Sequence, residues 1–432
     1  MSYTSPYTTF IFEKYSFDKT TATASFEYSF DHRRRFIEKI VFEKTTGFDA
    51  AVLEKVVWLA YLLAGTSYYK CFPTRDISFG DYPVTPLDVE LLDAVYRDGL
   101  SQFVFENHLT PDMLPEFHAT THDIEPISYD RRGTLVLQSG GKDSLLLAEL
   151  LKNNSHHFET VYMSSGDSYP HVIYDIQQRP PRLMRRIIDR EALTTAKADD
   201  ALNGHVPVTF IAYAYALIDA VLHREHMVLA AVGREGGEAH EFIGDFAINH
   251  QWSKTWEAEQ LLARYVSNRI APELSVGSPL RAYSELRIAE LFVQHAWAKY
   301  GHSFSSCNLA NYAQGQSNDK LKWCGECPKC ANSFLLFAPF VEPHELASLF
   351  AGENLFEKPS LADTFKGLLG IDGVMKPFEC VGETGELRLA YQMARERYGS
   401  DIYSLPFAVP ESNFDYRAPG PAQISLTTFI SF

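Results

Sequence analysis

The segment Ser139-Gly140-Gly141-Lys142-Asp143-Ser144 gathers small residues, hydroxyls, a cation and a carboxylate in consecutive positions. Two glycines let the backbone approach an anion closely, and a helix that begins directly after them offers unpaired N–H groups. The two serines add hydroxyl donors, Lys142 adds positive charge, and Asp143 can reach a magnesium ion that bridges phosphates. The spacing differs from the Walker pattern. We therefore predict a phosphate-binding loop of another kind, against the alternative of a turn that is merely rich in small residues.

A second group of reactive side chains is formed by Cys307, Cys324, Cys327 and Cys330, four of the six cysteines in the chain. Clustered thiols in a reducing compartment indicate a metal site before a disulfide. Four cysteines can close a tetrahedral zinc site that leaves no position for water, so the zinc would be structural. An iron–sulfur cluster and unmetallated buried thiols are the alternatives.

An arginine-rich segment at residues 179–190 stands out in an otherwise acidic chain. Arg182, Arg185 and Arg186 could bind a substrate diphosphate, because a guanidinium contacts phosphate oxygens in pairs. A solvated helix face is the alternative interpretation.

Further polar residues follow expected strands or lie on short loops. Ligands of open α/β sheets bind at strand ends, so these side chains are candidates for substrate binding or proton transfer, with a structural role as the alternative. They are His205, Arg234, Glu235, His250 and Trp252. Cys380 lies outside the cysteine cluster and is either an inert buried thiol or a thiolate that transfers protons.

Composition narrows the class of protein. The 432 residues carry 39 Lys plus Arg against 55 Asp plus Glu, a formal net charge of −16. So acidic a surface disfavours nucleic acid as the main partner. We find no apolar run of the ~18 residues that a membrane span needs, and no secretion signal at the N-terminus. We expect a cytoplasmic protein without a membrane partner, whose oligomeric state the sequence leaves open.

The elements that position these residues follow from periodicity. Residues 9–42 alternate polar with apolar or aromatic side chains, which predicts an antiparallel meander. A strand, glycine turn, helix and strand then follow over residues 134–163, which is typical of a parallel α/β unit. Helices are predicted at 49–63, 87–100, 145–152 and 208–222, and a further strand at 227–232. The predicted fold is an α/β parallel sheet with helices on both faces, preceded by a β-rich α+β domain. We divide the chain into residues 1–128, 129–345 with the cysteine loop, and a helical region at 346–432.

The loop at residues 139–144 resembles the SGGxDS loop of the ATP pyrophosphatase (PP-loop) superfamily, whose members cleave ATP between the α- and β-phosphates. In that superfamily the end of the second strand contacts the nucleotide, which implies Ser164 and Gly166 here. The cysteine spacing resembles that of QueC, but several further phrases resemble the MurL family of UDP-N-acetylmuramoyl-L-alanyl-L-glutamate epimerases. These phrases are residues 65–70, 202–209, 249–254, 281–286, 304–308, 323–330 and 377–382. Residues 232–236 depart from the family pattern, and only Arg234 and Glu235 align with it.

The resemblance implies that the enzyme adenylates the terminal carboxylate of UDP-MurNAc-L-Ala-L-Glu with ATP and Mg²⁺, then inverts the glutamate. Adenylation neutralises the carboxylate and makes the α-proton more acidic, so one group can remove it and another can return a proton. Lys142 and Asp143 would serve adenylation. His205, Glu235, His250 and Cys380 are the candidates for proton transfer.

Three other functions compete with this interpretation. A QueC-like enzyme that forms an amide or a nitrile needs ammonia, and the sequence has no glutaminase signature. A tRNA-modifying enzyme is disfavoured by the negative charge. A nucleotide sensor would not need the intact Lys142 and Asp143.

Overall fold

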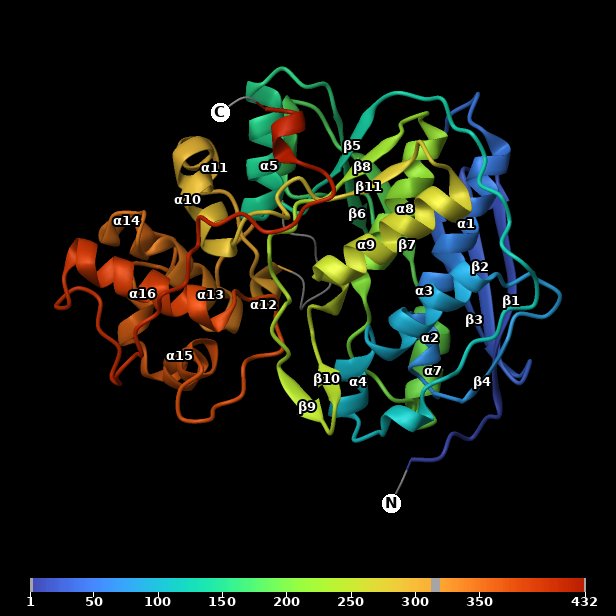
Figure 1. The fold of residues 1–432 in the computed structure, drawn as a ribbon, viewed down its shortest axis with the longest axis horizontal. Helices are drawn as coiled ribbons and strands as arrows, with labels where there is room; N and C mark the ends of the chain where they lie inside the picture. Colours follow the sequence, from blue (N-terminus) through green and yellow to red (C-terminus); the bar gives the residue numbers. More distant parts are fainter. Residues whose placement is uncertain (1–2, 312–318, 431–432) are drawn as a thin grey trace.

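One nine-stranded sheet organises the part of the chain that the computed structural model describes, residues 3–311 and 319–430. Figure 1 shows this sheet with helices packed over it and a separate group of helices to one side. In spatial order the strands are β11 (Ser275–Gly277), β8 (Met227–Leu229), β5 (Thr134–Leu137), β6 (Glu159–Ser164), β7 (Arg182–Ile187), β3 (Arg34–Val41), β2 (Thr23–Phe30), β1 (Thr9–Asp18) and β4 (Asp76–Ser78). A two-stranded ribbon, β9 (Glu241–Ile243) and β10 (Phe246–Ile248), stands apart from the sheet.

The strands from β11 to β7 run parallel to one another, which confirms the predicted α/β class. Strand β5 has the predicted bounds, whereas β8 is shorter than predicted and ends at Leu229. The chain leaves β5 toward β6 on one side and later returns to β8 on the other side. Such a reversal of strand order opens a crevice at the carboxyl ends of the strands, where ligands of open α/β sheets bind.

The N-terminal strands form the antiparallel meander that alternation predicted, and they continue the same sheet. Strand β3 pairs antiparallel with β7, so that Ile40 lies opposite Arg186. Alternate side chains of the meander, such as Phe10, Phe12 and Tyr28, are fully buried against helix α1. The division of the chain at residues 126–130 stays a prediction, but strands from both sides of it share one sheet.

Helices cover the sheet and extend it sideways. Helix α8 matches its predicted bounds, and α1 begins after Asp49, whose carboxylate caps the N–H groups of Ala51 and Val52. The helices are α1 (Ala50–Ala64), α2 (Thr66–Tyr69), α3 (Pro86–Arg97), α4 (Ser101–Glu106), α5 (Lys142–Asn153), α6 (His171–Gln177), α7 (Arg190–Ala198), α8 (Val208–Leu222), α9 (Trp256–Tyr265), α10 (Glu285–His295), α11 (Trp297–Tyr300), α12 (Asn308–Asn311), α13 (Pro328–Phe337), α14 (Pro343–Ser348), α15 (Ala362–Leu369) and α16 (Thr384–Tyr398). Contrary to the expectation that no apolar run reaches this length, the stretch Ala50–Tyr69 is long and apolar enough to cross a membrane. However, 72% of its apolar 18-residue window is buried inside the protein, as in a core helix.

Two apolar cores result. One core lies between the sheet and helices α1, α8 and α9, and the other joins α5 and α10 to the C-terminal helices α13, α15 and α16. In Figure 1 the C-terminal helices, in orange and red, lie at the opposite side of the molecule from the blue strands β1 to β4.

The structure of the arginine-rich segment at residues 179–190 differs from the helix that the sequence allowed. The helix-face alternative is wrong, because residues 182–187 form strand β7 between β6 and β3. Pairing with a strand on each side satisfies the backbone of the segment. The local sequence does not reveal that β6 and β3 will flank this segment, so the strand could not be predicted from it.

Candidate active site

A cavity of about 600 Å³ lies at the carboxyl ends of the central parallel strands. Ser139, Lys142 and Asp143 line it after β5, and Val232 and Glu235 line it after β8. Ser164, the last residue of β6, and Ser165 line it between them. The C-terminal half adds Asn308, Lys329 and Cys380. The cavity therefore stands at the reversal of strand order and is closed by segments far apart in the sequence.

Residues of the glycine-rich loop line this cavity, and the loop has a geometry suited to binding an anion. Gly140 has a φ of 76°, and a Cβ there would lie 2.6 Å from Leu321 Cδ1, so any other residue would strain the backbone and displace the Leu321 side chain. Gly141 precedes helix α5, whose first turn has no side-chain cap. The Ser139 hydroxyl accepts from the Gly141 N–H at 3.3 Å. Uncapped N–H groups at a helix start next to a lysine favour an anionic ligand such as a phosphate.

Lys142 lies between two carboxylates at the edge of the loop. Its Nζ contacts Asp143 Oδ1 at 2.6 Å and also Glu285 Oε2. Burial alone lowers the pKa of Lys142, but Asp143 and Glu285 outweigh that effect, so its net pKa lies above the ordinary value. Burial raises the pKa of Glu285 well above its usual range, and its Oε1 has no hydrogen-bond partner among the described residues. Glu285 is a cavity residue that the sequence interpretation did not select.

Lys254 and Glu235 form a second ion pair in the cavity, with Nζ and Oε1 3.2 Å apart. Burial alone lowers the pKa of Lys254, yet the nearby Cys380 and Glu235 raise it above its ordinary value. The same interaction holds the pKa of Glu235 below its usual range despite burial. The structure thus adds Lys254 as a partly buried cation beside Cys380.

Cys380 reaches the cavity from the loop that precedes α16, and its Sγ lies 3.7 Å from His250 Nε2. The His205 ring packs on His250 with centroids 4.3 Å apart. Burial lowers the pKa of His205 to about 3 and that of His250 to about 4. Both imidazoles are therefore neutral at pH 7. The structure brings together Glu235, His205, His250 and Cys380, of which Glu235 and Cys380 line the cavity itself.

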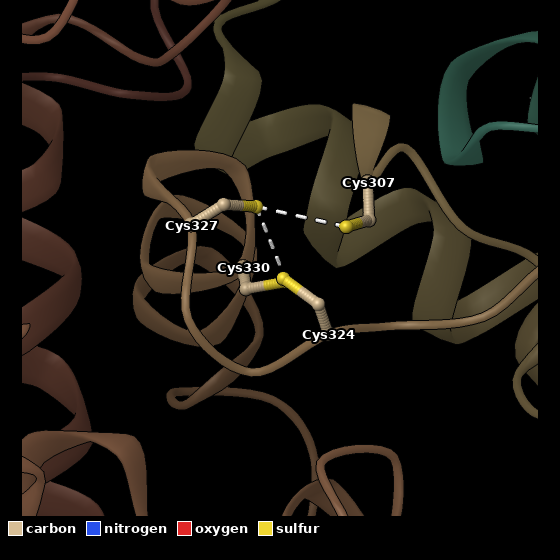
Figure 2. Close-up of side chains that lie close together, drawn as sticks. All are labelled: Cys307, Cys324, Cys327 and Cys330. Atoms are coloured by element: carbon tan, nitrogen blue, oxygen red, sulfur yellow. Dashed lines mark hydrogen bonds between the residues drawn. The ribbon is translucent and has the colours of Figure 1, made fainter. Parts of the chain in front are cut away.

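The four clustered cysteines converge on one point, and Figure 2 shows their sulfurs directed toward one another. The distances are 3.6 Å for Cys307 to Cys327, 3.7 Å for Cys324 to Cys330 and 3.5 Å for Cys327 to Cys330. A zinc ion with bonds of ~2.3 Å separates tetrahedral thiolates by about 3.8 Å, so this donor set fits a single zinc ion. An iron–sulfur cluster would hold its thiolates farther apart, because several atoms lie between them.

The remaining candidate residues lie around the cavity. Ser164 lines it, and the Ser164 hydroxyl accepts from the Gly166 N–H at 3.1 Å. Arg185 projects from β7 to Asp167 at 2.6 Å and is 40% exposed. Arg234 stacks over Phe414, and Trp252 packs on Phe210, neither of them lining the cavity.

Arg182 and Arg186 are already engaged by buried acids. Arg182 contacts Asp219 at 2.9 Å and Glu225 at 2.5 Å. Arg186 donates to both oxygens of Glu38 at 2.7 and 3.1 Å. These pairs explain why arginines can occupy a central strand, and they leave Arg185 as the most accessible of the three.

Two residues that sequence reasoning passed over, Lys254 and Glu285, lie in phrases 249–254 and 281–286 that it had already singled out. Ser284 caps α10 by accepting from the Arg287 N–H, which places Glu285 in the first turn. A serine followed by an acid at a helix start was the available local signal, but only the fold shows that this helix end faces Lys142.

These features define an α/β protein with a glycine-rich loop at a strand reversal, whose geometry suits an anion, and a four-cysteine site of metal-binding geometry. The MurL N-terminal domain matches residues 1–278 and the MurL C-terminal domain matches residues 303–402. The chain belongs to the MurL family.

Curated relatives extend over most of the chain. One from Micromonospora sp. is 33% identical over 422 residues, covering 93% of this chain and 91% of the relative. One from Salinispora tropica is 32% identical over 428 residues, covering 93% and 89%. One from Xanthomonas oryzae pv. oryzae is 31% identical over 395 residues, covering 90% and 86%. Each is named UDP-N-acetyl-alpha-D-muramoyl-L-alanyl-L-glutamate epimerase.

Proposed function

We propose that this chain is an ATP-dependent epimerase of the PP-loop superfamily that acts on UDP-MurNAc-L-Ala-L-Glu in peptidoglycan synthesis. It inverts the terminal L-Glu to D-Glu and releases AMP and pyrophosphate in the cytoplasm. The names of the relatives support the substrate and the inversion. One observation carries the use of ATP: the phosphate-binding loop and the groups able to transfer protons line the same cavity.

In the first step a terminal carboxylate oxygen attacks the α-phosphorus of ATP, and the bond to the β-phosphate bridge breaks. The N–H groups of the Ser139–Ser144 loop and Lys142 neutralise phosphate charge during this transfer. Asp143 lines the same cavity and would hold Mg²⁺, which would neutralise further charge on the polyphosphate. Ser164 and Gly166 would contact the nucleotide from the end of β6.

In the second step the α-proton leaves the adenylated glutamate and a proton returns to the other face. We assign these transfers to Cys380 and Glu235, because both reach the cavity and both lie near the Lys254 ammonium. Positive charge next to a thiol or a carboxylate stabilises the anion that accepts the proton. Water then attacks the acyl carbon and releases AMP, so one ATP and one water are consumed for each inversion.

Two further assignments complete the proposal. Arg185 would bind the substrate diphosphate, since its partner Asp167 is exposed and can be displaced. The four cysteines would hold a structural zinc ion. Their segment supplies Ser305, Ser306 and Lys329 to the cavity wall, so the metal would fix that wall.

The test is incubation with ATP, Mg²⁺ and UDP-MurNAc-L-Ala-L-Glu in D₂O, followed by chiral amino-acid analysis and mass spectrometry. We expect D-Glu with one deuterium at Cα, together with AMP and pyrophosphate. Cys380→Ser and Glu235→Gln should lower kcat by about 100-fold or more, whereas Glu241→Gln on the exposed β9 should not. Consumption of ATP without deuterium at Cα would favour a ligase such as a QueC-like enzyme, and absence of turnover would refute the epimerase.

A further inference from the structure

A chain of hydrogen bonds runs from the protein surface to the cavity thiol. Glu106 is exposed at the end of α4 and accepts from Gln102 Nε2 at 2.8 Å. Gln102 Oε1 lies 2.6 Å from His250 Nδ1, and His250 Nε2 lies 3.7 Å from Cys380 Sγ. Gln102 is buried and does not line the cavity, so it does not belong to the substrate surface.

The chemistry of the groups fixes the direction of these bonds. An ionised carboxylate can only accept, so the amide nitrogen of Gln102 must face Glu106. The amide oxygen then faces His250 and can only accept, which requires the proton of the neutral imidazole to be on Nδ1. The lone pair of Nε2 is consequently directed at the Cys380 thiol. A reversed amide would place its oxygen against the carboxylate, which is unfavourable.

Other contacts hold the three segments in this arrangement. The Asn249 N–H donates to Ser101 Oγ at 3.0 Å, which ties the His250 loop to the start of α4. Gln251 Nε2 donates to the Val381 carbonyl at 2.9 Å, which ties the same loop to the Cys380 segment. Phe378 packs on Phe105 of α4 with ring centroids 5.6 Å apart. An N-terminal helix and a C-terminal loop thereby meet at His250.

We propose that Gln102 and Glu106 are positioning residues that hold His250 as its Nδ1–H tautomer, with Nε2 as the group that takes the Cys380 thiol proton. The proposal rests on the proposed function, in which Cys380 transfers the α-proton. The thiol proton passes to Nε2, the thiolate accepts the α-proton, and Nδ1–H keeps its bond to Gln102 throughout. Gln102 thus stabilises the imidazolium that accompanies the thiolate.

Further charged and titratable groups surround this chain and act on the same equilibrium. They are Lys254, Lys329 and Glu379 with His205 and His240. Lys254 favours the thiolate by its positive charge, and the same charge opposes the imidazolium. Among the described residues Gln102 is the hydrogen-bond partner of Nδ1, and Glu106 fixes its amide orientation, so these two residues set the tautomer.

The experiment measures carbamidomethylation of Cys380 by iodoacetamide in the full chain, resolved by peptide mass spectrometry between about pH 5 and pH 9. Gln102→Met keeps the length of the side chain but removes the acceptor. We expect its Cys380 alkylation at neutral pH and its kcat to fall by about 10- to 100-fold, as for other residues that orient a functional histidine. The KM for ATP should not change. The exchange Gln102→Glu with Glu106→Gln retains an acceptor for Nδ1 and a hydrogen bond between positions 102 and 106, and should restore most of the alkylation rate.

The control is Glu116→Gln, which removes an exposed acid remote from this chain of contacts and should alkylate as the parent does. An unchanged alkylation profile in folded Gln102→Met overturns the proposal, as does a Gln102→Glu/Glu106→Gln double variant no more reactive than Gln102→Met. If Gln102→Met does not fold, Glu106→Gln carries the same test. It frees the amide to reverse, so its alkylation should fall, and an unchanged rate overturns the proposal. Failure of the epimerase itself would be seen separately, as missing deuterium in the unaltered enzyme.

Discussion

Arg281 binds Glu259 inside the protein through two hydrogen bonds to the same carboxylate oxygen, at 2.7 and 3.1 Å. Both side chains are almost fully buried, with 3% and 4% exposure. The Nη1 of Arg281 also donates to the backbone oxygens of Gly233 and Lys254, at 2.7 and 2.6 Å. One guanidinium therefore joins the segment that carries Glu235 to the turn that carries Lys254.

Replacement of Arg281 by methionine should leave Glu259 buried without a counter-ion and release both backbone segments. We expect the free energy of unfolding to fall by about 3 to 5 kcal/mol, measured by urea denaturation. The control is Arg264→Met, because Arg264 pairs with Glu90 at the surface and both are about half exposed. That change should cost no more than about 1 kcal/mol. Equal losses in the two variants would contradict this prediction.

Gly140→Ala should abolish ATP binding with a limited loss of stability. The φ of 76° and the close approach to Leu321 both oppose a Cβ, so the loop must shift. The strain of the new conformation should cost about 1 to 3 kcal/mol. Isothermal titration calorimetry with ATP measures the result. Gly373→Ala is the matched control, because Gly373 has a φ of 67° with nothing near its Cβ position. It should bind ATP normally, and tight binding by Gly140→Ala would speak against the loop.

Cys327→Ser should remove the bound metal and disturb the cavity wall that the cysteine segment forms. The parent protein should contain one zinc ion per chain by elemental analysis, and a chelator should lower its Tm. Cys380→Ser should keep the full zinc content, since Cys380 is outside the converging set. A protein that contains iron and sulfide with visible absorption would replace the zinc assignment.

Arg185→Met should raise the KM for the nucleotide-sugar substrate by about 10- to 100-fold, the value of a charge-assisted hydrogen bond. Its stability should change little, because its only ion-pair partner among the described side chains, Asp167, is exposed. Arg182→Met should instead lower the stability and leave the KM little changed, because it leaves Asp219 and Glu225 buried without a cation. An unchanged KM in Arg185→Met would remove this residue from the substrate site.

Stability should depend on pH through the buried His240. Burial lowers its pKa to about 3 from the ordinary 6.5, so the unfolded chain takes up this proton first as the pH falls. The stabilisation is complete above about pH 6.5 and is lost toward acid by about 1.4 kcal/mol per pH unit. Glu386, whose pKa burial raises to about 7, acts in the opposite direction. We therefore compare the parent with one variant.

The unfolding free energy of His240→Phe should fall less steeply than that of the parent between about pH 6.5 and pH 4. The difference in slope should correspond to one titrating group. Urea denaturation at several pH values gives the slope. His302→Gln, at an exposed imidazole, should keep the slope of the parent. Parallel curves for His240→Phe and the parent would show that the pKa of His240 is not lower in the folded protein than in the unfolded chain.

Local sequence patterns predicted the elements that carry their own signals. The bounds of α8 and β5 followed from apolar runs, and the loop at Ser139–Ser144 followed from glycine and helix-start chemistry. Strand β7 could not be predicted, because its arginines are stabilised by Glu38, Asp219 and Glu225 from distant parts of the chain. Burial of such charges depends on partners that only the fold brings together.

The candidate site divides in the same way. The cysteine cluster and the loop were predictable because their residues are close in sequence. The Glu285 contact to Lys142 and the Gln102 contact to His250 each span more than 140 positions, and no local period encodes them. Single residues such as Cys380 could be selected by type, whereas their proton partners required coordinates.

The pairing of β3 with β7 has a consequence for any attempt to divide this protein. Cutting the chain near residue 128 would leave an unpaired strand edge on each fragment, β3 on one and β7 on the other. Exposed edges of this length pair readily with other chains. Fragments expressed separately should therefore aggregate, whereas fragments expressed together should re-associate through β3 and β7. Each half should be recovered only as part of that complex.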